Sequence, residues 1–176
     1  MIELETDRLL LRQWQPEDLA PWIAMNQDPE VRKYFGSLLT AEESTLALNR
    51  YREKLETSEF GLWAVEVKER NEFIGFIGIS EQDVSNAISP FKEIGWRLKQ
   101  DAWGKGFATE GAREVLKYGH TLFPTIYSMT AKVNKPSIKV MERIGMKRAK
   151  DLDFNHPRVN DELLKPHLIY MSELPT

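Results

Sequence analysis

Eight consecutive residues, Trp103-Gly104-Lys105-Gly106-Phe107-Ala108-Thr109-Glu110, combine two glycines with the start of a helical pattern. Apolar or small residues recur at steps of three and four from Ala108 to Leu122, which predicts that a helix begins here. The first turn of a helix presents main-chain N–H groups without an internal partner, and the helix dipole makes that end positive. Glycine lacks a Cβ atom, so a ligand can come close to the main chain. We therefore expect this loop to bind an anion, most naturally a phosphate.

Two familiar phosphate motifs do not describe this segment. Gly104, Gly106 and Gly111 lack the spacing of the dinucleotide fingerprint, whose third glycine follows the second by three residues. Lys105 lies between two glycines, so the segment does not end in the Gly-Lys-Ser/Thr of a P-loop. A tight turn, in which the glycines serve only the backbone, is the alternative that these residues leave open.

The composition excludes several classes of function. With 176 residues, of which 41% are hydrophobic, the chain is most simply one domain with a buried core. A net charge of −3 with both signs interspersed argues against a broad nucleic-acid surface. The absence of cysteine removes disulfides and thiolate chemistry and suits the cytoplasm, where we expect the protein. The three histidines are far apart in the sequence, and we expect no metal site. No apolar run reaches the length of a membrane helix, and the first residues do not resemble a signal peptide.

The apolar pattern predicts a mixed order of strands and helices. The predicted elements are a strand at 8–12, a helix at 16–28, a helical turn at 31–35, a helix at 40–55, a hairpin of strands at 62–67 and 73–79, a strand at 93–98, a helix at 108–122, a strand at 126–133, a helix at 134–144, and strands at 146–154 and 167–171. Thr40 and Glu43 have the spacing of a capping box, and Gly75 and Gly78 indicate a bulge or close packing. This order predicts a mixed sheet covered by helices, in the α+β or α/β range.

Three separated pieces of the chain together resemble one protein family. They are Glu93-Ile94-Gly95-Trp96 leading to the glycine loop, Asn134-Lys135-Pro136-Ser137 followed by Ile144-Gly145-Met146, and Asp153-Phe154-Asn155-His156-Pro157 with His167 and Tyr170. With the opening Thr6-Asp7-Arg8-Leu9-Leu10-Leu11-Arg12, they resemble the GNAT superfamily of acetyl-CoA-dependent N-acetyltransferases. Within that superfamily the chain is most similar to the enzymes that acetylate ribosomal-protein N-termini.

The resemblance implies a fold and a cosubstrate. The fold is α+β with α/β-type layers, in which a mixed, mostly antiparallel central sheet has splayed middle strands and helices on both faces. A single N-acetyltransferase domain would span residues 1–176, and acetyl-CoA would be the cosubstrate, with no metal. Acetyl-pantetheine would pair with the strand before the loop, and the pyrophosphate would meet the loop main chain. The cofactor-binding residues implied in this way are Arg97, Leu98, Lys99, Trp103, Gly104, Lys105, Gly106, Phe107, Ala108, Thr109, Asn134 and Ser137. Trp103 departs from the Gln or Arg that commonly begins this loop in the family.

The resemblance also suggests catalytic roles. Many members carry a tyrosine seven residues after the Asn, as the acid that protonates the departing thiolate, but Met141 stands there in this chain. Ser137, one turn earlier, is the nearest replacement, although a serine in a first helical turn can be purely structural. Likewise, Asn134 is expected to contact coenzyme A, while its type and place also suit an N-cap. Glu93 is our candidate for the carboxylate that takes the amine proton, although strand alternation puts it and Leu98 on opposite faces unless a bulge intervenes.

The expected acceptor is a primary amine, on a small molecule or at a protein N-terminus. Residues 22–35, 81–90 and 156–165 are expected to select it. The aromatic residues Trp22, Tyr34 and Phe35 could line a pocket there, but we expect most of them in the core, and we expect His156 to form loop hydrogen bonds. A coenzyme A-binding module that has lost catalysis is the alternative, because the family's tyrosine is missing. We expect no nucleic-acid or membrane partner, and a monomer or homodimer.

Overall fold

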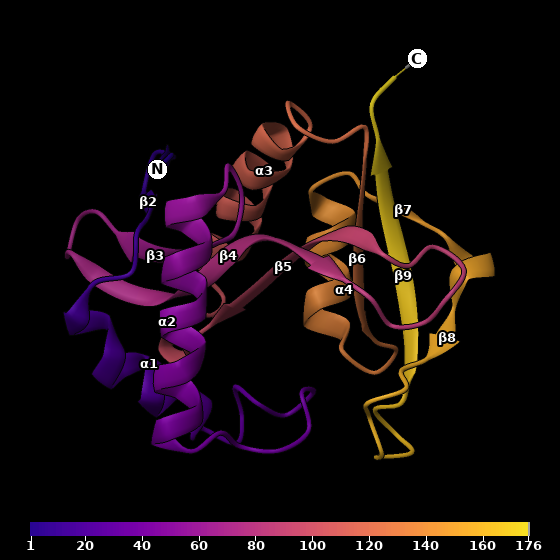
Figure 1. Ribbon diagram of the computed structural model, residues 1–176, viewed down its shortest axis with the longest axis horizontal. Coiled ribbons are helices and arrows are strands. Elements are labelled where there is room, and N and C mark those ends of the chain that lie inside the picture. The colour runs from indigo at the N-terminus through magenta and orange to yellow at the C-terminus, as the bar shows by residue number, and fades with distance from the viewer. Residues whose placement is uncertain (176) are drawn as a thin grey trace.

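The computed structural model describes residues 1–175, whose strands form a nine-stranded sheet with helices packed on it (Figure 1). The strand order is β1-β2-β3-β4-β5-β6-β9-β7, and β8 pairs with β9. The strands are β1 (Leu4–Glu5), β2 (Leu9–Arg12), β3 (Leu62–Val67), β4 (Glu72–Gln82), β5 (Phe91–Leu98), β6 (Thr125–Ala131), β7 (Lys147–Arg148), β8 (Phe154–Asn155) and β9 (Pro166–Glu173). The α-helices are α1 (Leu19–Asn26), α2 (Ala41–Thr57), α3 (Phe107–Gly119) and α4 (Lys135–Arg143), and the 3-10 turns are η1 (Pro16–Asp18), η2 (Gln100–Ala102) and η3 (Lys150–Leu152).

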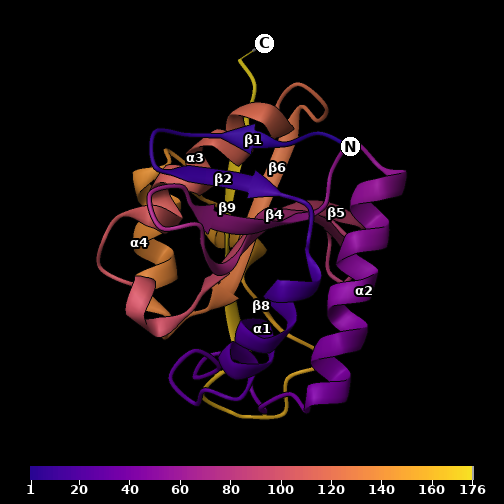
Figure 2. The same cartoon turned by 90° about the vertical axis from the view of Figure 1, so that its left-hand side faces the viewer.

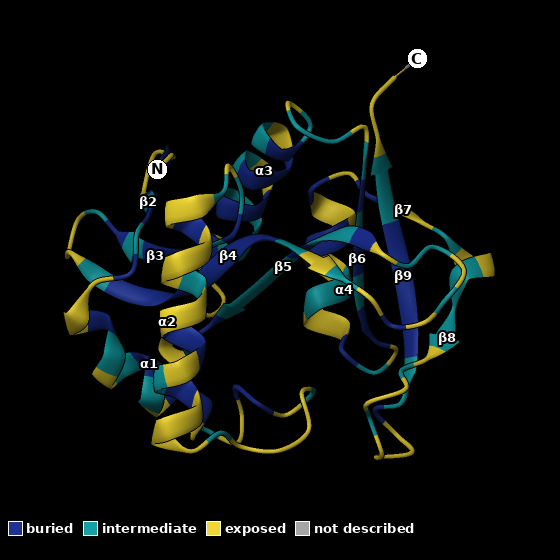
Figure 3. Ribbon diagram, in the orientation of Figure 1, coloured by how far each residue is buried: buried dark blue, intermediate teal, exposed yellow. Residues whose placement is uncertain are grey.

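Helices cover both faces of the sheet, as expected (Figure 2). On one face, Phe76 of β4 packs against Trp22 of α1 and Tyr51 of α2, with ring centroids 5.9 and 6.0 Å apart. The next residue, Ile77, lies on the opposite face against Gly111 of α3, where a Cβ atom would come within 2.4 Å of the Ile77 side chain. The core therefore lies on both sides of the buried central strands, while the outer surface of α2 is exposed (Figure 3). None of the helices among residues 1–175 has the length and apolar character needed to cross a membrane.

The middle strands separate, which confirms the expected splay. Strands β4 and β5 pair over eight positions, from Gly75–Leu98 to Gln82–Phe91, without a shift of register. By contrast, the described parts of β5 and β6 are parallel and share one paired position, Glu93 with Tyr127. Figure 1 shows β5 running obliquely away from β6 and β9. An opening between two central strands is thus built into the sheet.

The bulge predicted from the glycines of β4 is present. The register between β3 and β4 shifts between Val65 and Glu66, which leaves Ile74 as the extra residue of β4. Gly75 adopts a φ of +140°, and a Cβ atom on it would lie 2.1 Å from the Arg97 carbonyl oxygen. Only glycine allows β4 to approach the end of β5 this closely.

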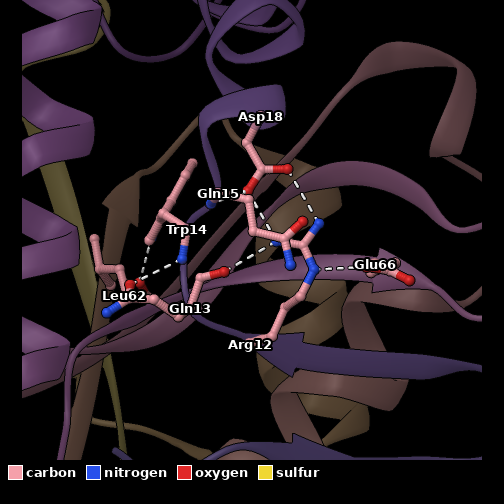
Figure 4. Close-up of polar contacts among 7 residues, drawn as sticks. All are labelled: Arg12, Gln13, Trp14, Gln15, Asp18, Leu62 and Glu66. Atoms are coloured by element: carbon pink, nitrogen blue, oxygen red, sulfur yellow. Dashed lines mark hydrogen bonds and ion pairs between the residues drawn. The ribbon is translucent and has the colours of Figure 1, made fainter.

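A buried ion pair fixes α1 against the N-terminal edge of the sheet (Figure 4). The guanidinium of Arg12, 5% exposed, donates two hydrogen bonds to the Asp18 carboxylate, at 2.8 and 3.0 Å. Its Nε also donates to Glu66 of β3 at 2.6 Å, and Asp18 accepts from the Gln15 N–H at 2.8 Å. One arginine therefore joins β2, β3 and the start of α1.

Some predicted boundaries differ from the structure. The predicted strand at 146–154 is wrong: the chain forms β7, η3 and β8 there, because its charged residues lack the apolar alternation of a buried strand. Arg148 instead pairs with Asp153, with Nη1 and Oδ1 2.6 Å apart. Residues 31–35 form hydrogen-bonded turns without a continuing helix. The capping box of Thr40 and Glu43 is confirmed by reciprocal hydrogen bonds of 3.1 Å.

Candidate active site

A cavity of about 330 Å³ lies where β5 and β6 diverge, beside the first turns of α4. Its wall includes Glu93, Gly95 and Arg97 of β5, Ser128 and Thr130 of β6, and Ser137 and Met141 of α4. Tyr34 and Phe35, which precede α2, and His156 and His167 from the C-terminal part of the chain also line it. The fold thus brings together five parts of the chain, which lie between residues 34 and 167 of the sequence.

The main chain of β5 faces this opening at every second residue. The Lys99 N–H donates to the Ile74 carbonyl of β4 at 2.8 Å, and the Ser128 hydroxyl of β6 donates to the Ile94 carbonyl at 3.0 Å. Because peptide groups alternate along a strand, those of Ile94, Trp96 and Leu98 point toward β6 and those of Arg97 and Lys99 toward β4. Of the expected pantetheine-binding residues Arg97, Leu98 and Lys99, it is Leu98 whose main chain faces the opening.

The glycine loop has the geometry expected of an anion cradle. Gly104 and Gly106 adopt φ angles of +74° and +80°, in the left-handed region that favours glycine, and Gly106 is the N-cap of α3. The Glu110 N–H bonds to the Gly106 carbonyl at 3.0 Å, so the N–H groups of 107–109 come before the first intrahelical bond. The Trp103 indole N–H donates to the Leu98 carbonyl at 2.9 Å and links the loop to the end of β5.

Arg8 anchors this loop, a role that sequence reasoning missed. Its Nε lies 2.7 Å from Glu110 Oε1, its Nη1 donates to the Lys105 carbonyl at 2.9 Å, and it stacks on Phe107 at 4.5 Å. Although partial burial favours the neutral carboxyl group, hydrogen bonds from Thr6 and Arg8 outweigh it and lower the pKa of Glu110. Arg8 lies in the Thr6–Arg12 stretch that supported the family resemblance, but its partners Glu110 and Lys105 are about one hundred residues away in the chain.

Asn134 caps α4, which confirms the prediction that its type and place suit an N-cap. Its Oδ1 accepts the Ser137 N–H at 3.3 Å, and its Nδ2 donates to Thr130 Oγ1 at 2.9 Å. The contact with coenzyme A that the resemblance implies for Asn134 stays a prediction. Ser137 lines the cavity together with Met141, which is 1% exposed.

Glu93 lines the cavity at the point where β5 and β6 separate. Its Oε2 accepts the Met129 N–H at 3.3 Å. Burial raises the pKa of Glu93 to about 8, and this hydrogen bond offsets part of the shift. The unbroken register of β5 with β4 places the side chains of Glu93 and Leu98 on opposite faces. A carboxylic acid that titrates near neutral pH is suited to proton transfer.

The expected acceptor residues divide into core and cavity. Trp22 is fully buried, and its indole N–H donates to the Ser44 carbonyl at 2.9 Å, so it belongs to the core as expected. Tyr34 and Phe35 line the cavity, so the expectation that most of the three aromatic residues lie in the core was wrong. The His156 ring accepts a loop hydrogen bond from the Arg158 N–H at 3.2 Å, as expected. Burial and the neighbouring His167 lower the pKa of His156 to about 4, so its ring is neutral at pH 7.

The Arg97 side chain is a further cavity residue that sequence reasoning missed. The resemblance had implied only that Arg97 binds the cofactor as part of residues 97–99. Its side chain lies on the same face of β5 as Glu93 and Gly95, because these positions are two residues apart. That alternation was readable in the sequence, whereas the cavity it faces was not.

Known proteins resemble this chain in sequence. The family model of the acetyltransferase (GNAT) domain matches residues 8–147. The chain is 32% identical over 156 residues to the uncharacterized N-acetyltransferase p20 of Bacillus licheniformis, covering 84% of each chain.

The chain belongs to the GNAT acetyltransferase family.

Solved structures agree with the fold of this GNAT acetyltransferase. The acetyltransferase (GNAT family) from Bacillus anthracis superposes with a TM-score of 0.80 at 24% identity, over 98% of both chains. RimL, a ribosomal L7/L12 α-N-protein acetyltransferase solved in complex with coenzyme A, superposes with a TM-score of 0.77 at 10% identity, again over 98% of both chains. At these identities the likeness concerns the fold alone. Membership of the family makes the protein an acetyltransferase that uses acetyl-CoA.

Proposed function

We propose that this enzyme transfers the acetyl group of acetyl-CoA directly to a primary amine held in the cavity between β5 and β6. The observation that carries the proposal is that the end of β5 connects the glycine loop to the cavity between β5 and β6. Leu98 presents its main chain to the opening, and its carbonyl is bonded to Trp103 of the glycine loop. A phosphate-binding loop and an acceptor cavity are thus adjacent along one strand.

The cosubstrate would occupy the opening in two parts. The pyrophosphate would bind the main chain of 103–109, at the N-terminus of α3, where free N–H groups and the helix dipole favour negative charge. The pantetheine arm would pair with the exposed peptide groups of β5 at Leu98, with Arg97 and Lys99 on either side. Asn134 and Ser137 would contact it from α4.

Acetyl transfer needs a polarised carbonyl, a neutral amine and a stabilised thiolate. A main-chain N–H at Leu98 would polarise the thioester carbonyl. The amine nitrogen forms a bond to the acetyl carbon while the carbon–sulfur bond breaks, and the amine proton passes to Glu93, directly or through water. The Ser137 hydroxyl would donate to the departing sulfur, in place of the tyrosine that Met141 replaces.

The acceptor would be a small-molecule amine or a protein N-terminus. Similarity in fold to RimL favours the protein N-terminus, since that protein is named for acetylation of ribosomal L7/L12. The cavity volume of about 330 Å³ suits an extended terminal residue or a small amine equally. In this proposal the whole of residues 1–176 forms one N-acetyltransferase domain.

Turnover and binding together test the proposed function. Purified protein is mixed with acetyl-CoA and a panel of amines and N-terminal peptides, and both free coenzyme A thiol and acetylated product are measured. We expect product with at least one amine, and an upward Tm shift with acetyl-CoA, equivalent to about 2.7 kcal/mol at a hundredfold excess over Kd. A Tm shift without turnover on any amine would point to the coenzyme A-binding module, and no shift would refute the cosubstrate assignment.

A further inference from the structure

The Arg97 guanidinium has an incomplete set of partners. Its Nη1 donates to Asn26 Oδ1 at a long 3.4 Å, and its Nε is buried without a hydrogen-bond partner among residues 1–175. The aromatic rings of Phe35 and Phe76 lie 4.4 and 5.3 Å from its Cζ atom. Aromatic faces attract a cation, but they do not satisfy its N–H groups.

No carboxylate within the described chain forms an ion pair with Arg97. By contrast, the buried Arg12 pairs with both Asp18 and Glu66. A second buried cation lies nearby instead: Arg32 is 7% exposed, and among residues 1–175 its side chain hydrogen-bonds only to the carbonyls of Ser37 and Phe35. Burial and the charge of Arg32 lower the pKa of Arg97 to about 10, which leaves it charged at pH 7.

The cavity beside Arg97 therefore carries an uncompensated positive charge. Among the titratable groups that line it, His156 is neutral at pH 7 and burial also lowers the pKa of His167. The raised pKa of Glu93 keeps most of that carboxyl group protonated at pH 7. A buried charge without a partner is costly, so an anion entering the cavity gains a strong and specific interaction.

We propose that the acceptor amine carries an anionic group, a carboxylate or a phosphate, which pairs with the Arg97 guanidinium inside the cavity. This inference rests on the proposed function, since it names the class of amine that the cavity selects. Gly95 leaves space along β5 between Glu93 and Arg97, because among the described residues not adjacent to it only Glu93 Oε1, at 3.9 Å, comes within 4 Å of a Cβ atom built on it. The substrate amine then lies on the Glu93 side and its anionic group on the Arg97 side.

Matched pairs of amines test the proposal. The pairs are glycine and glycinamide, β-alanine and β-alaninamide, γ-aminobutyrate and its amide, and phosphoethanolamine and ethanolamine, with acidic and neutral N-terminal peptides added. Since hydrogen bonds to a charged group contribute about 1.5–3 kcal/mol, we expect the anionic member of at least one pair to be preferred by about 10- to 100-fold in kcat/KM. The carboxylate and phosphate pairs distinguish the two kinds of anion.

Three variants assign the preference to one side chain. Arg97→Gln should abolish the preference for the anionic amine, and Arg97→Lys should retain part of it. Arg52→Gln is the matched control, since it removes the same charge from an exposed position on α2. The inference is overturned if the wild-type enzyme acetylates neutral and anionic partners equally, or if Arg97→Gln keeps the preference. In either case acetylation of any amine leaves the proposed function standing, whereas no acetylation at all refutes that function itself.

Discussion

The Glu93 carboxylate of β5 accepts the Met129 main-chain N–H of β6 at 3.3 Å, just beyond the one paired position of these two strands. In a continuing parallel ladder this N–H would bond to the main chain of β5. The Ile94 carbonyl is likewise taken by a side chain, the Ser128 hydroxyl. Side chains thus replace ladder hydrogen bonds where the strands separate, and one of them is the proposed proton acceptor.

Glu93→Gln should therefore change the pH dependence of catalysis. If Glu93 takes the amine proton, kcat/KM of the wild-type enzyme rises with pH up to about 8, as the carboxylate forms. Ionisation of the substrate amine adds a rise of its own, so the ratio of wild-type to variant rates is the quantity to plot. We expect this ratio to increase through pH 8 and to reach about 100-fold, the lower range for general base catalysis. A ratio that does not vary with pH would show that Glu93 is not the base.

The same raised pKa predicts that the free energy of unfolding falls as pH rises, whereas kcat/KM rises. The folded protein holds the Glu93 proton more tightly than the unfolded chain, in which the pKa is near 4.5. The contribution of Glu93 to stability is therefore complete below about pH 4.5 and is lost as pH rises through about 8. Urea unfolding at pH 6 and pH 9 should show a smaller loss of stability for Glu93→Gln than for the wild type. An equal loss in both proteins would contradict the raised pKa.

Gly106→Ala should weaken coenzyme A binding more than its effect on stability explains. Gly106 and Gly145 have φ angles of +80° and +87°, so alanine at either costs about 1–2 kcal/mol of backbone strain. Gly145 follows α4 and is not part of the loop segment 103–110, and a Cβ atom there has no neighbour within 4 Å among the described residues. In the proposed binding mode only the methyl group at 106 would occupy space needed by the pyrophosphate, and we expect a rise in Kd of about tenfold or more, or about 1.4 kcal/mol. Equal affinities of the two variants in calorimetry would place the pyrophosphate elsewhere.

Ser137→Ala should lower kcat while leaving acetyl-CoA affinity nearly unchanged. The N-cap of α4 uses the Ser137 main-chain N–H, which alanine retains, so the substitution removes the hydroxyl alone. Charge on the sulfur develops only in the transition state, and we expect a loss of about 1–3 kcal/mol, or roughly ten- to a hundredfold in kcat. Adding Met141→Tyr to this variant should restore part of the rate, although overpacking at that buried position costs about 1–3 kcal/mol of stability. A Ser137→Ala enzyme with full kcat would end this assignment.

Asp18→Asn should strongly destabilise the protein. It removes the charge that balances the buried Arg12, and breaking a buried pair in this way costs about 3–5 kcal/mol. Glu66→Gln is the comparison, because Glu66 is more exposed and accepts one hydrogen bond from Arg12, and its loss should be smaller. Both are measured by urea unfolding at pH 7. A change of less than 1 kcal/mol for Asp18→Asn would show that the remaining partners of Arg12, the Glu66 carboxylate and the Gln13 carbonyl, already compensate its charge.

The sequence by itself determined the features that depend on near neighbours in the chain. The capping box of Thr40 and Glu43, and the helix that begins after Gly106, follow from hydrogen bonds between residues three or four apart. The bulge at Gly75 was readable for a similar reason, because glycine within a strand marks a close approach.

Only the tertiary structure decided the chemistry of the site. The contact of Glu93 with Met129 joins residues 36 apart, that of Arg97 with Asn26 joins residues 71 apart, and that of Arg8 with Glu110 joins residues 102 apart. The charge state of each group depends on which atoms exclude water from it, and those atoms come from distant elements. Local pattern therefore predicts where the strands and helices form, whereas the packing of those elements decides which carboxyl group holds its proton and which guanidinium lacks a partner.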